Sequence, residues 1–108
     1  AIAKEQNTYF FIKDGFKTIK IAFEDILLIK SSGNYLDIIT KHKTWSTRMT
    51  FTEFIDKQLP LVFTRVHQSY LINNSKIDKI EHNQISIETY NIPISTKYKE
   101  LFFKSLKS

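Results

Sequence analysis

Short apolar runs separated by polar turn residues recur along the chain, and this pattern predicts many short strands. The predicted strands are residues 8–13, 16–22, 26–30, 35–41, 44–48, 63–73, 77–81, 84–89 and 92–94. The run 26–30 is almost continuously apolar, which predicts a strand buried on both faces. Asp14-Gly15, His82-Asn83 and Tyr90-Asn91 have the residue types of tight turns between neighbouring strands.

Two segments have helical rather than alternating spacing. Thr50 and Glu53 have the spacing of a capping box, and a helix is expected from Phe51 to Gln58, before Pro60. Ser95 is placed to cap a final helix. The apolar face expected to pack this helix on the core consists of Tyr98, Leu101, Phe102 and Leu106.

Size and composition indicate one mostly β domain. The chain has 108 residues, enough for one core but not for two. Aromatic residues make up 14% of the chain, and β-branched residues are abundant, both of which favour strands. Residues 1–7 have no clear pattern, whereas residues 8–108 read as the domain itself.

The charge of the chain favours an acidic partner such as nucleic acid. The formal net charge is +5, and of the 16 basic residues only Arg48 and Arg65 are arginines. Arg offers a planar fork of donors to phosphates and bases, whereas Lys acts as a point charge. These two positions are therefore the first candidates for testing.

Several classes of function are not expected. With no Cys, a disulfide framework and thiol chemistry are excluded. The scattered His42, His67 and His82 suggest neither a metal site nor a catalytic centre, and Gly15 and Gly33 are too few for a phosphate-binding loop. No apolar run approaches the ~20 residues of a membrane span. We expect a cytoplasmic protein that is not an enzyme, needs no cofactor and has no membrane partner.

The segment Phe63–Asn73 is the most informative part of the chain because it places Arg65, His67 and Gln68 within a predicted strand. In one reading, these polar side chains leave the core to meet phosphates or base edges. In the other, they are exposed edge residues followed by an ordinary turn. Arg65 could equally pair with Glu24 or Asp25, and the sequence leaves these alternatives open.

Three ordered blocks resemble the LytTR family of bacterial DNA-binding domains. The first is Glu24–Tyr35 (EDILLIKSSGNY), the second Phe63–Asn73 (FTRVHQSYLIN) and the third Ile92–Tyr98 (IPISTKY). The second matches the family pattern F-x-R-x-H-x-S-[YF]-[IVL]-[IV]-N. The resemblance covers roughly residues 16 to 106, nearly the whole chain.

The resemblance implies an elongated, nearly all-β fold of about ten short strands in three small sheets, with a short central helix and a C-terminal helix. It also implies binding of double-stranded DNA by loops. Many family members are output domains of two-component response regulators, so a receiver domain is expected in a longer parent chain. Repeated half-sites and a homodimer on DNA are expected partners.

By position, the resemblance points to a set of DNA-contacting residues. These are Ser31, Ser32, Asn34, Tyr35, Arg65, His67, Gln68, Ser69, Ser95, Thr96 and Lys97. Gln68 stands where the family most often has Arg, and Gln pairs with adenine whereas Arg prefers guanine. Lys97 also stands where Arg is frequent, so a phosphate contact is expected there. His67 could instead order its loop, Gln68 could face solvent, and Asn34 and Tyr35 could simply be turn and strand residues.

The rival interpretation is a small β domain that binds single-stranded nucleic acid or a protein. Exposed aromatic residues together with Lys would suit base stacking. Most large aromatic residues here lie at positions with apolar periodicity, however, which indicates a core role. The residues expected in the core on this ground are Phe23, Phe51, Phe54, Phe63 and Phe102.

Overall fold

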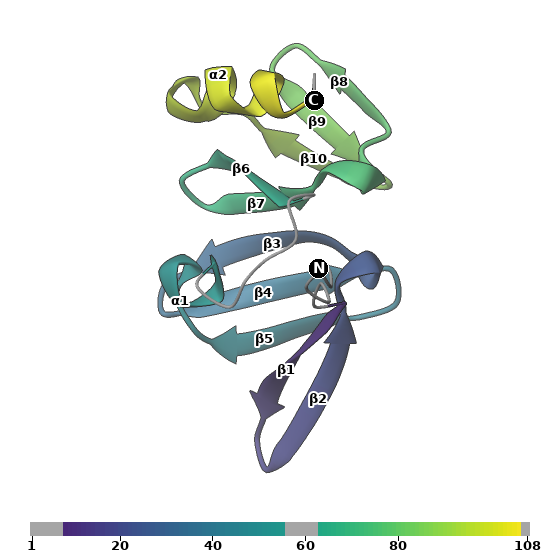
Figure 1. Ribbon diagram of the computed structural model, residues 1–108, viewed down its shortest axis with the longest axis vertical. Helices are drawn as coiled ribbons and strands as arrows, with labels where there is room; N and C mark the ends of the chain where they lie inside the picture. Colours follow the sequence, from purple (N-terminus) through teal and green to yellow (C-terminus); the bar gives the residue numbers. More distant parts are fainter. Residues whose placement is uncertain (1–7, 56–62, 107–108) are drawn as a thin grey trace, which may run out of the picture.

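Ten short strands and two α-helices make up residues 8–55 and 63–106, the part of the chain that this computed structural model describes (Figure 1). The strands are β1 (Tyr9–Asp14), β2 (Lys17–Ala22), β3 (Ile26–Ser32), β4 (Tyr35–Thr40), β5 (Thr44–Arg48), β6 (Phe63–His67), β7 (Tyr70–Asn73), β8 (Lys79–Glu81), β9 (Gln84–Ile87) and β10 (Tyr90–Pro93). The helices are α1 (Phe51–Ile55) and α2 (Thr96–Ser105), and 3₁₀ turns occupy Phe23–Asp25 and Asn74–Lys76. The predicted mostly β class, with a short central helix and a C-terminal helix, is confirmed.

The strands form three small antiparallel sheets, as expected. A hairpin of β1 and β2 lies at one end of the molecule, and a three-stranded sheet in the order β10-β9-β8 lies at the other (Figure 1). Between them is a five-stranded sheet in the order β5-β4-β3-β7-β6. Strand β3 is therefore paired on both sides, with β4 and with β7.

Strand β3 is buried on both faces, which confirms the prediction from its apolar run. Ile26 and Ile29 pack in one hydrophobic cluster, and Leu27 and Leu28 pack in another. Strict alternation would place Leu27 and Leu28 on opposite faces. A β-bulge between Ile26 and Leu28 shifts the register, so that both leucines can serve the same cluster.

Each face of the central sheet is covered by different elements. The β1–β2 hairpin and α1 cover one face, to which they contribute Phe10, Ile12, Ile21, Phe51 and Phe54. The three-stranded sheet and α2 cover the other face, to which they contribute Ile85, Ile87, Ile92 and Phe102, and Ile94 packs there from the link between β10 and α2. The expected core positions of Phe23, Phe51, Phe54 and Phe102 are confirmed, and Phe63 packs against the first cluster.

Two of the three predicted hairpin turns differ by a residue or two from the prediction. The first turn consists of Gly15 and Phe16, because Asp14 still pairs with Lys17 and Gly15 adopts the positive φ of 66° that the turn needs. The turn before β10 consists of Glu88 and Thr89 rather than Tyr90-Asn91. Pairing of Tyr90 with Ile87 extends that hairpin beyond what residue types indicate.

The other predicted turn, His82-Asn83, is confirmed: both residues have positive φ, 52° and 61°. The capping box at the start of α1 is also confirmed. The Thr50 N–H donates to the Glu53 carboxylate at 3.3 Å, and the Glu53 N–H donates to the Thr50 hydroxyl at 3.2 Å. The predicted extension of this helix to Gln58 lies outside the described residues.

Helix α2 buries a narrower face than predicted. Phe102 is fully buried, whereas Leu101 and Leu106 are 64% and 41% exposed. The second side chain that packs on the core is Phe103, next to Phe102. The helix thus packs on the core through two adjacent aromatic residues, of which Phe102 was predicted and Phe103 was not. No helix within the described ranges is long and apolar enough to span a membrane.

Two substitutions in α2 test this packing. Phe102→Ala removes a fully buried ring and should lower the free energy of unfolding by about 3–5 kcal/mol. Leu101→Ala, its neighbour on the same helix, should change that free energy by less than about 0.5 kcal/mol because the side chain is exposed. The free energies of unfolding of both variants are compared by urea denaturation. Similar losses from both would contradict the observed face of α2.

Candidate nucleic-acid interface

The segment 63–73 is a hairpin and not the single strand that the sequence suggested. Strands β6 and β7 are joined by a two-residue turn, Gln68-Ser69, and His67 pairs with Tyr70. The backbone N–H of Ser69 donates to Nδ1 of His67 at 3.0 Å. This bond bends the chain back within two residues, which strand alternation alone could not reveal. It requires a lone pair on Nδ1, so the proton of a neutral ring sits on Nε2.

Arg65 holds the same turn from the other side. Its NH2 nitrogen donates to the carbonyl of Gln68 at 2.8 Å, and its Nε donates to the carbonyl of His67 at 3.4 Å. The guanidinium carbon also lies 4.9 Å from the ring centroid of Phe51 and 5.2 Å from that of Tyr98. Of the alternatives that the sequence left open, pairing with Glu24 or Asp25 does not occur among the described residues.

The β3–β4 turn forms a second hairpin tip. Ser32 pairs with Tyr35 across a two-residue turn of Gly33 and Asn34. Gly33 has a φ of 61°, a conformation in which a side chain would be strained. The Asn34 carbonyl accepts a hydrogen bond from the N–H of Met49 at 3.2 Å, which ties this tip to the end of β5.

These two tips lie at the same end of the central sheet. Strands β3 and β7 pair as far as Lys30 and Tyr70, and the N–H of Ser31 then donates to the carbonyl of Ser69 at 2.8 Å. The turn that ends β3 is therefore fixed next to the turn that begins β7. Figure 1 shows both tips on the left-hand edge of the molecule.

The start of α2 joins the same edge. The N–H of Ser95 donates to the carbonyl of Val66 at 2.8 Å, so the residue before the helix is bound to the end of β6. Ser95 occupies the N-cap position as predicted, but its hydroxyl makes no capping hydrogen bond. Lys97 follows in the first turn, is exposed, and its Nζ lies 5.5 Å from the ring centroid of Tyr98.

The structure thus brings together the residues predicted from the resemblance to contact DNA, although they come from three distant segments. We call this surface the tip edge, and it comprises residues 31–35, 67–69 and 95–97 together with Arg65. The half-buried members are Ser31, Arg65, His67, Ser69 and Ser95. The exposed members are Ser32, Asn34, Tyr35, Gln68, Thr96 and Lys97. Several half-buried members hold the edge together, while the exposed ones face solvent.

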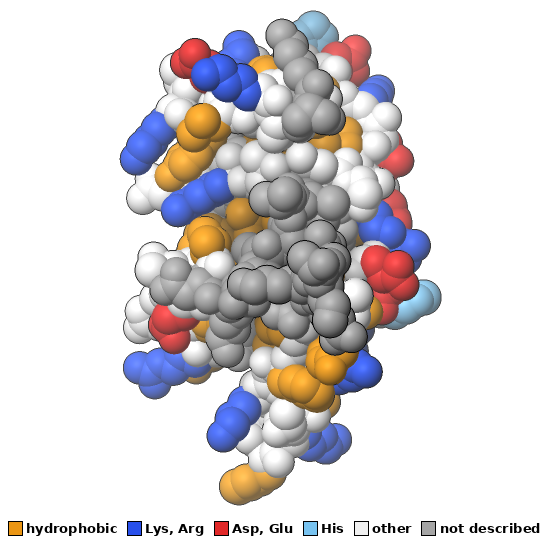
Figure 2. Space-filling model, viewed as in Figure 1, with side chains coloured by type: hydrophobic (Ala, Val, Ile, Leu, Met, Phe, Trp, Pro, Cys, Tyr) orange, Lys and Arg blue, Asp and Glu red, His pale blue; other side chains and the backbone are white. Residues whose placement is uncertain are grey.

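Charge is favourably distributed along this surface. None of the three segments contains an acidic residue. Figure 2 shows Lys and Arg side chains at several heights along the left-hand edge, whereas acidic side chains are more numerous on the opposite edge. The edge therefore offers hydrogen-bond donors and positive charge to an anionic ligand.

Asn73, the last residue of the 63–73 segment, is buried, and its side-chain amide is hydrogen-bonded through both its nitrogen and its oxygen. Its side chain is 1% exposed. Its amide nitrogen donates to the carbonyl of Ile26 at 3.0 Å, and its amide oxygen accepts from the N–H and the hydroxyl of Ser75 at 3.0 and 2.7 Å. Asn73 thus orders the turn that follows β7. Its contact with β3, which anchors the hairpin to the sheet, was not predicted.

A match to a family model identifies the kind of domain. Residues 16–107 match the model of the LytTr DNA-binding domain. The chain belongs to this family. A solved structure of the LytTr DNA-binding domain of a protein described as a methyl-accepting/DNA response regulator, from Bacillus cereus, has the same fold. It matches 94% of this chain and 99% of its own with a TM-score of 0.79 and 19% sequence identity.

A longer regulator is also similar to this LytTr domain. Transcriptional regulatory protein YpdB of Escherichia coli is 29% identical over 80 residues, which is 74% of this chain and 32% of YpdB. The chain therefore spans about a third of the length of that relative.

Within residues 8–55 and 63–106 of the LytTr domain, no group of three or more His, Asp or Glu side chains could hold a metal ion.

Replacing each of the two arginines of this domain by lysine tests whether Arg65 holds the β6–β7 turn. Arg65→Lys keeps the charge but loses the fork that binds the hairpin turn, so the free energy of unfolding should fall by about 1–2 kcal/mol. Arg48→Lys should leave it unchanged, because Arg48 is exposed. The free energies of unfolding of both variants are measured by urea denaturation. Equal stability of the two variants would show that Arg65 does not hold the turn.

Proposed function

We propose that this LytTr domain binds double-stranded DNA in a sequence-specific manner through its tip edge. The observation that carries the proposal is the convergence of three separate segments, tied by the Ser31–Ser69 and Ser95–Val66 backbone hydrogen bonds. Short turns held by a rigid sheet project polar side chains without a recognition helix. Because the turns are already held in place, less conformational entropy is lost on binding.

The side chains of the tip edge suit different parts of a duplex. Gln68 stands at the apex of the β6–β7 turn and is exposed, so its amide can reach a base edge, with adenine as the matching base. Lys97 and the hydroxyl groups of the neighbouring residues suit phosphates. His67 uses Nδ1 for its own turn, which leaves the Nε2 proton to donate to a phosphate oxygen.

The biological setting we propose is bacterial transcription regulation. Both relatives are named as regulators, one as a transcriptional regulatory protein and one as a response regulator. We therefore propose that this domain is the cytoplasmic output end of a two-component response regulator whose parent chain includes a receiver. Binding as a homodimer to repeated half-sites would make the second contact intramolecular, so that the overall affinity would exceed that of one tip edge.

One feature favours the rival function, binding of single strands or of a protein. Tyr9, Phe11 and Phe16 are exposed on the β1–β2 hairpin, and Tyr9 and Phe11 make an edge-to-face contact. These rings lie apart from the tip edge, whose only exposed aromatic residue is Tyr35.

Catalysis is not proposed. A catalytic pair would need the His67 ring to accept the hydroxyl proton of Ser69, but Nδ1 of His67 accepts the backbone N–H of Ser69 instead.

Selection from a random library of duplexes tests the proposal. Bound duplexes are recovered, and the affinity of the domain for the enriched sequence is compared with that for a scrambled duplex and for a single strand of the same sequence. Enrichment of one motif, with preference for the duplex, is the expected result. Preference for the single strand would support the rival function instead.

Gln68→Ala tests base reading. On the enriched duplex the loss should be about 5- to 150-fold, equivalent to ~1–3 kcal/mol, and confined to one base pair. Binding to scrambled DNA should change little. The Gln68 carbonyl that accepts the hydrogen bond from Arg65 is retained, so the turn should remain intact. An equal loss of affinity on every sequence would show that Gln68 does not recognise a base.

Lys97→Ala tests a phosphate contact at the start of α2. Affinity should fall to a similar extent on all duplexes, and the slope of log affinity against log salt should flatten by about one unit. Lys104→Ala is the matched control, because Lys104 is also exposed on α2 but lies in its last turn. Titrations at several salt concentrations give the slopes. Identical slopes for the two variants would argue against the contact.

A further inference from the structure

The two arginines of this chain have opposite surroundings. Arg65 is half-buried and its fork is occupied by the carbonyls of the β6–β7 turn. Arg48 is exposed at the end of β5, and its side chain has no hydrogen bond, ion pair or ring contact to any described residue. Only Arg48 thus has its whole guanidinium available to a ligand, although the sequence resemblance pointed to Arg65.

Arg48 lies next to the tip edge, at the end of a row of exposed residues that begins at the β3–β4 tip. Ser32 of β3 pairs with Tyr35 of β4, and Tyr35 pairs with Arg48 of β5. Directly paired residues on antiparallel strands project to the same face of a sheet and lie about 5 Å apart. All three are exposed, with Tyr35 at 49%. The hydrogen bond from Met49 to Asn34 holds this end of β5 beside the β3–β4 tip.

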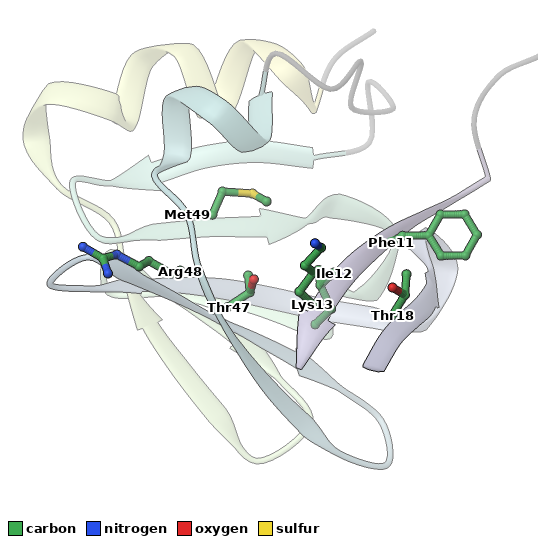
Figure 3. A pocket seen from close by; sticks show the side chains of 7 residues that line it. All are labelled: Phe11, Ile12, Lys13, Thr18, Thr47, Arg48 and Met49. Carbon is green, nitrogen blue, oxygen red and sulfur yellow. The ribbon is translucent and has the colours of Figure 1, made fainter. Parts of the chain in front are cut away.

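The direction of the Arg48 side chain also suits an external ligand. Arg48 borders a surface pocket of about 440 Å³ between β5 and the β1–β2 hairpin. The other residues of the lining are Phe11, Ile12, Lys13, Thr18, Thr47 and Met49. Figure 3 shows the Arg48 guanidinium pointing out of this pocket, away from Lys13 and Thr18. The positive charge of Arg48 is therefore directed to solvent and not into the pocket.

We propose that Arg48 contacts a phosphate group of the duplex beside the β3–β4 tip, as a fourth contact of the tip edge. The inference rests on the proposed binding of duplex DNA. Strand β5 is the edge strand of the sheet on the side away from β6 and α2, so its end lies at the margin of the bound DNA, where we expect phosphates rather than bases within reach. The planar fork of Arg matches two phosphate oxygens, and the Ser32 and Tyr35 hydroxyls lie in the same row.

Arg48→Ala and Lys41→Ala form a matched pair for the test. Lys41 is exposed just beyond the far end of β4, roughly 20 Å from Arg48 along the strand, and its loss removes the same charge. Binding of each variant to the enriched duplex and to a scrambled duplex is titrated at several salt concentrations. Arg48→Ala should bind both duplexes about tenfold more weakly and flatten the salt slope by about one unit. Lys41→Ala should match the wild type.

A third variant, Arg48→Lys, separates phosphate from base recognition. It should keep most of the salt slope, because a phosphate contact survives as a point charge. A loss confined to one base pair would assign Arg48 to base reading and overturn the phosphate contact. Equal affinities of Arg48→Ala and Lys41→Ala, with normal binding by the wild type, would overturn only this inference. Wild-type protein that fails to bind duplex would overturn the proposed function together with it.

Discussion

The burial of β3 on both faces is the constraint on which the rest of this structure depends. A strand paired on both sides and covered on both faces has no position left for a polar residue within its buried part, and Ile26–Ile29 are all apolar. The bulge after Ile26 divides these four side chains between two hydrophobic clusters. The β1–β2 hairpin, α1, α2 and the three-stranded sheet are then held by contact with one cluster or the other.

Only at its end does β3 become polar, and this change creates the tip edge. Beyond Ile29 the strand no longer fills a core, so Lys30 and Ser32 are exposed and Ser31 bonds to a neighbouring turn. Backbone hydrogen bonds from Ser31 and Ser95 fix the three segments, and Arg65 uses its donors to hold the β6–β7 turn. Polar groups thus divide into those that build the edge and those that remain available for binding.

Local sequence predicted local structure well. The capping box of Thr50 and Glu53, the His82-Asn83 turn and the doubly buried run of β3 were all read correctly, because each depends on residues a few positions apart. Two hairpin turns were nevertheless misplaced by a residue or two, and the β6–β7 turn was missed. The other errors arose where partners far along the chain decide. Leu101 fits a helical stripe but is exposed, since the sheet beneath α2 meets Phe102 and Phe103 instead.

The candidate site shows the same division. The sequence by itself determined the strand-rich composition, the positive charge and the three motifs, since these are properties of residue types and their spacing. Only the tertiary structure decided that the motifs meet at one edge, that Arg65 faces inward and that Arg48 faces outward. Strand pairing joins residues that are distant along the chain, and which donors it leaves unpaired cannot be read from local patterns.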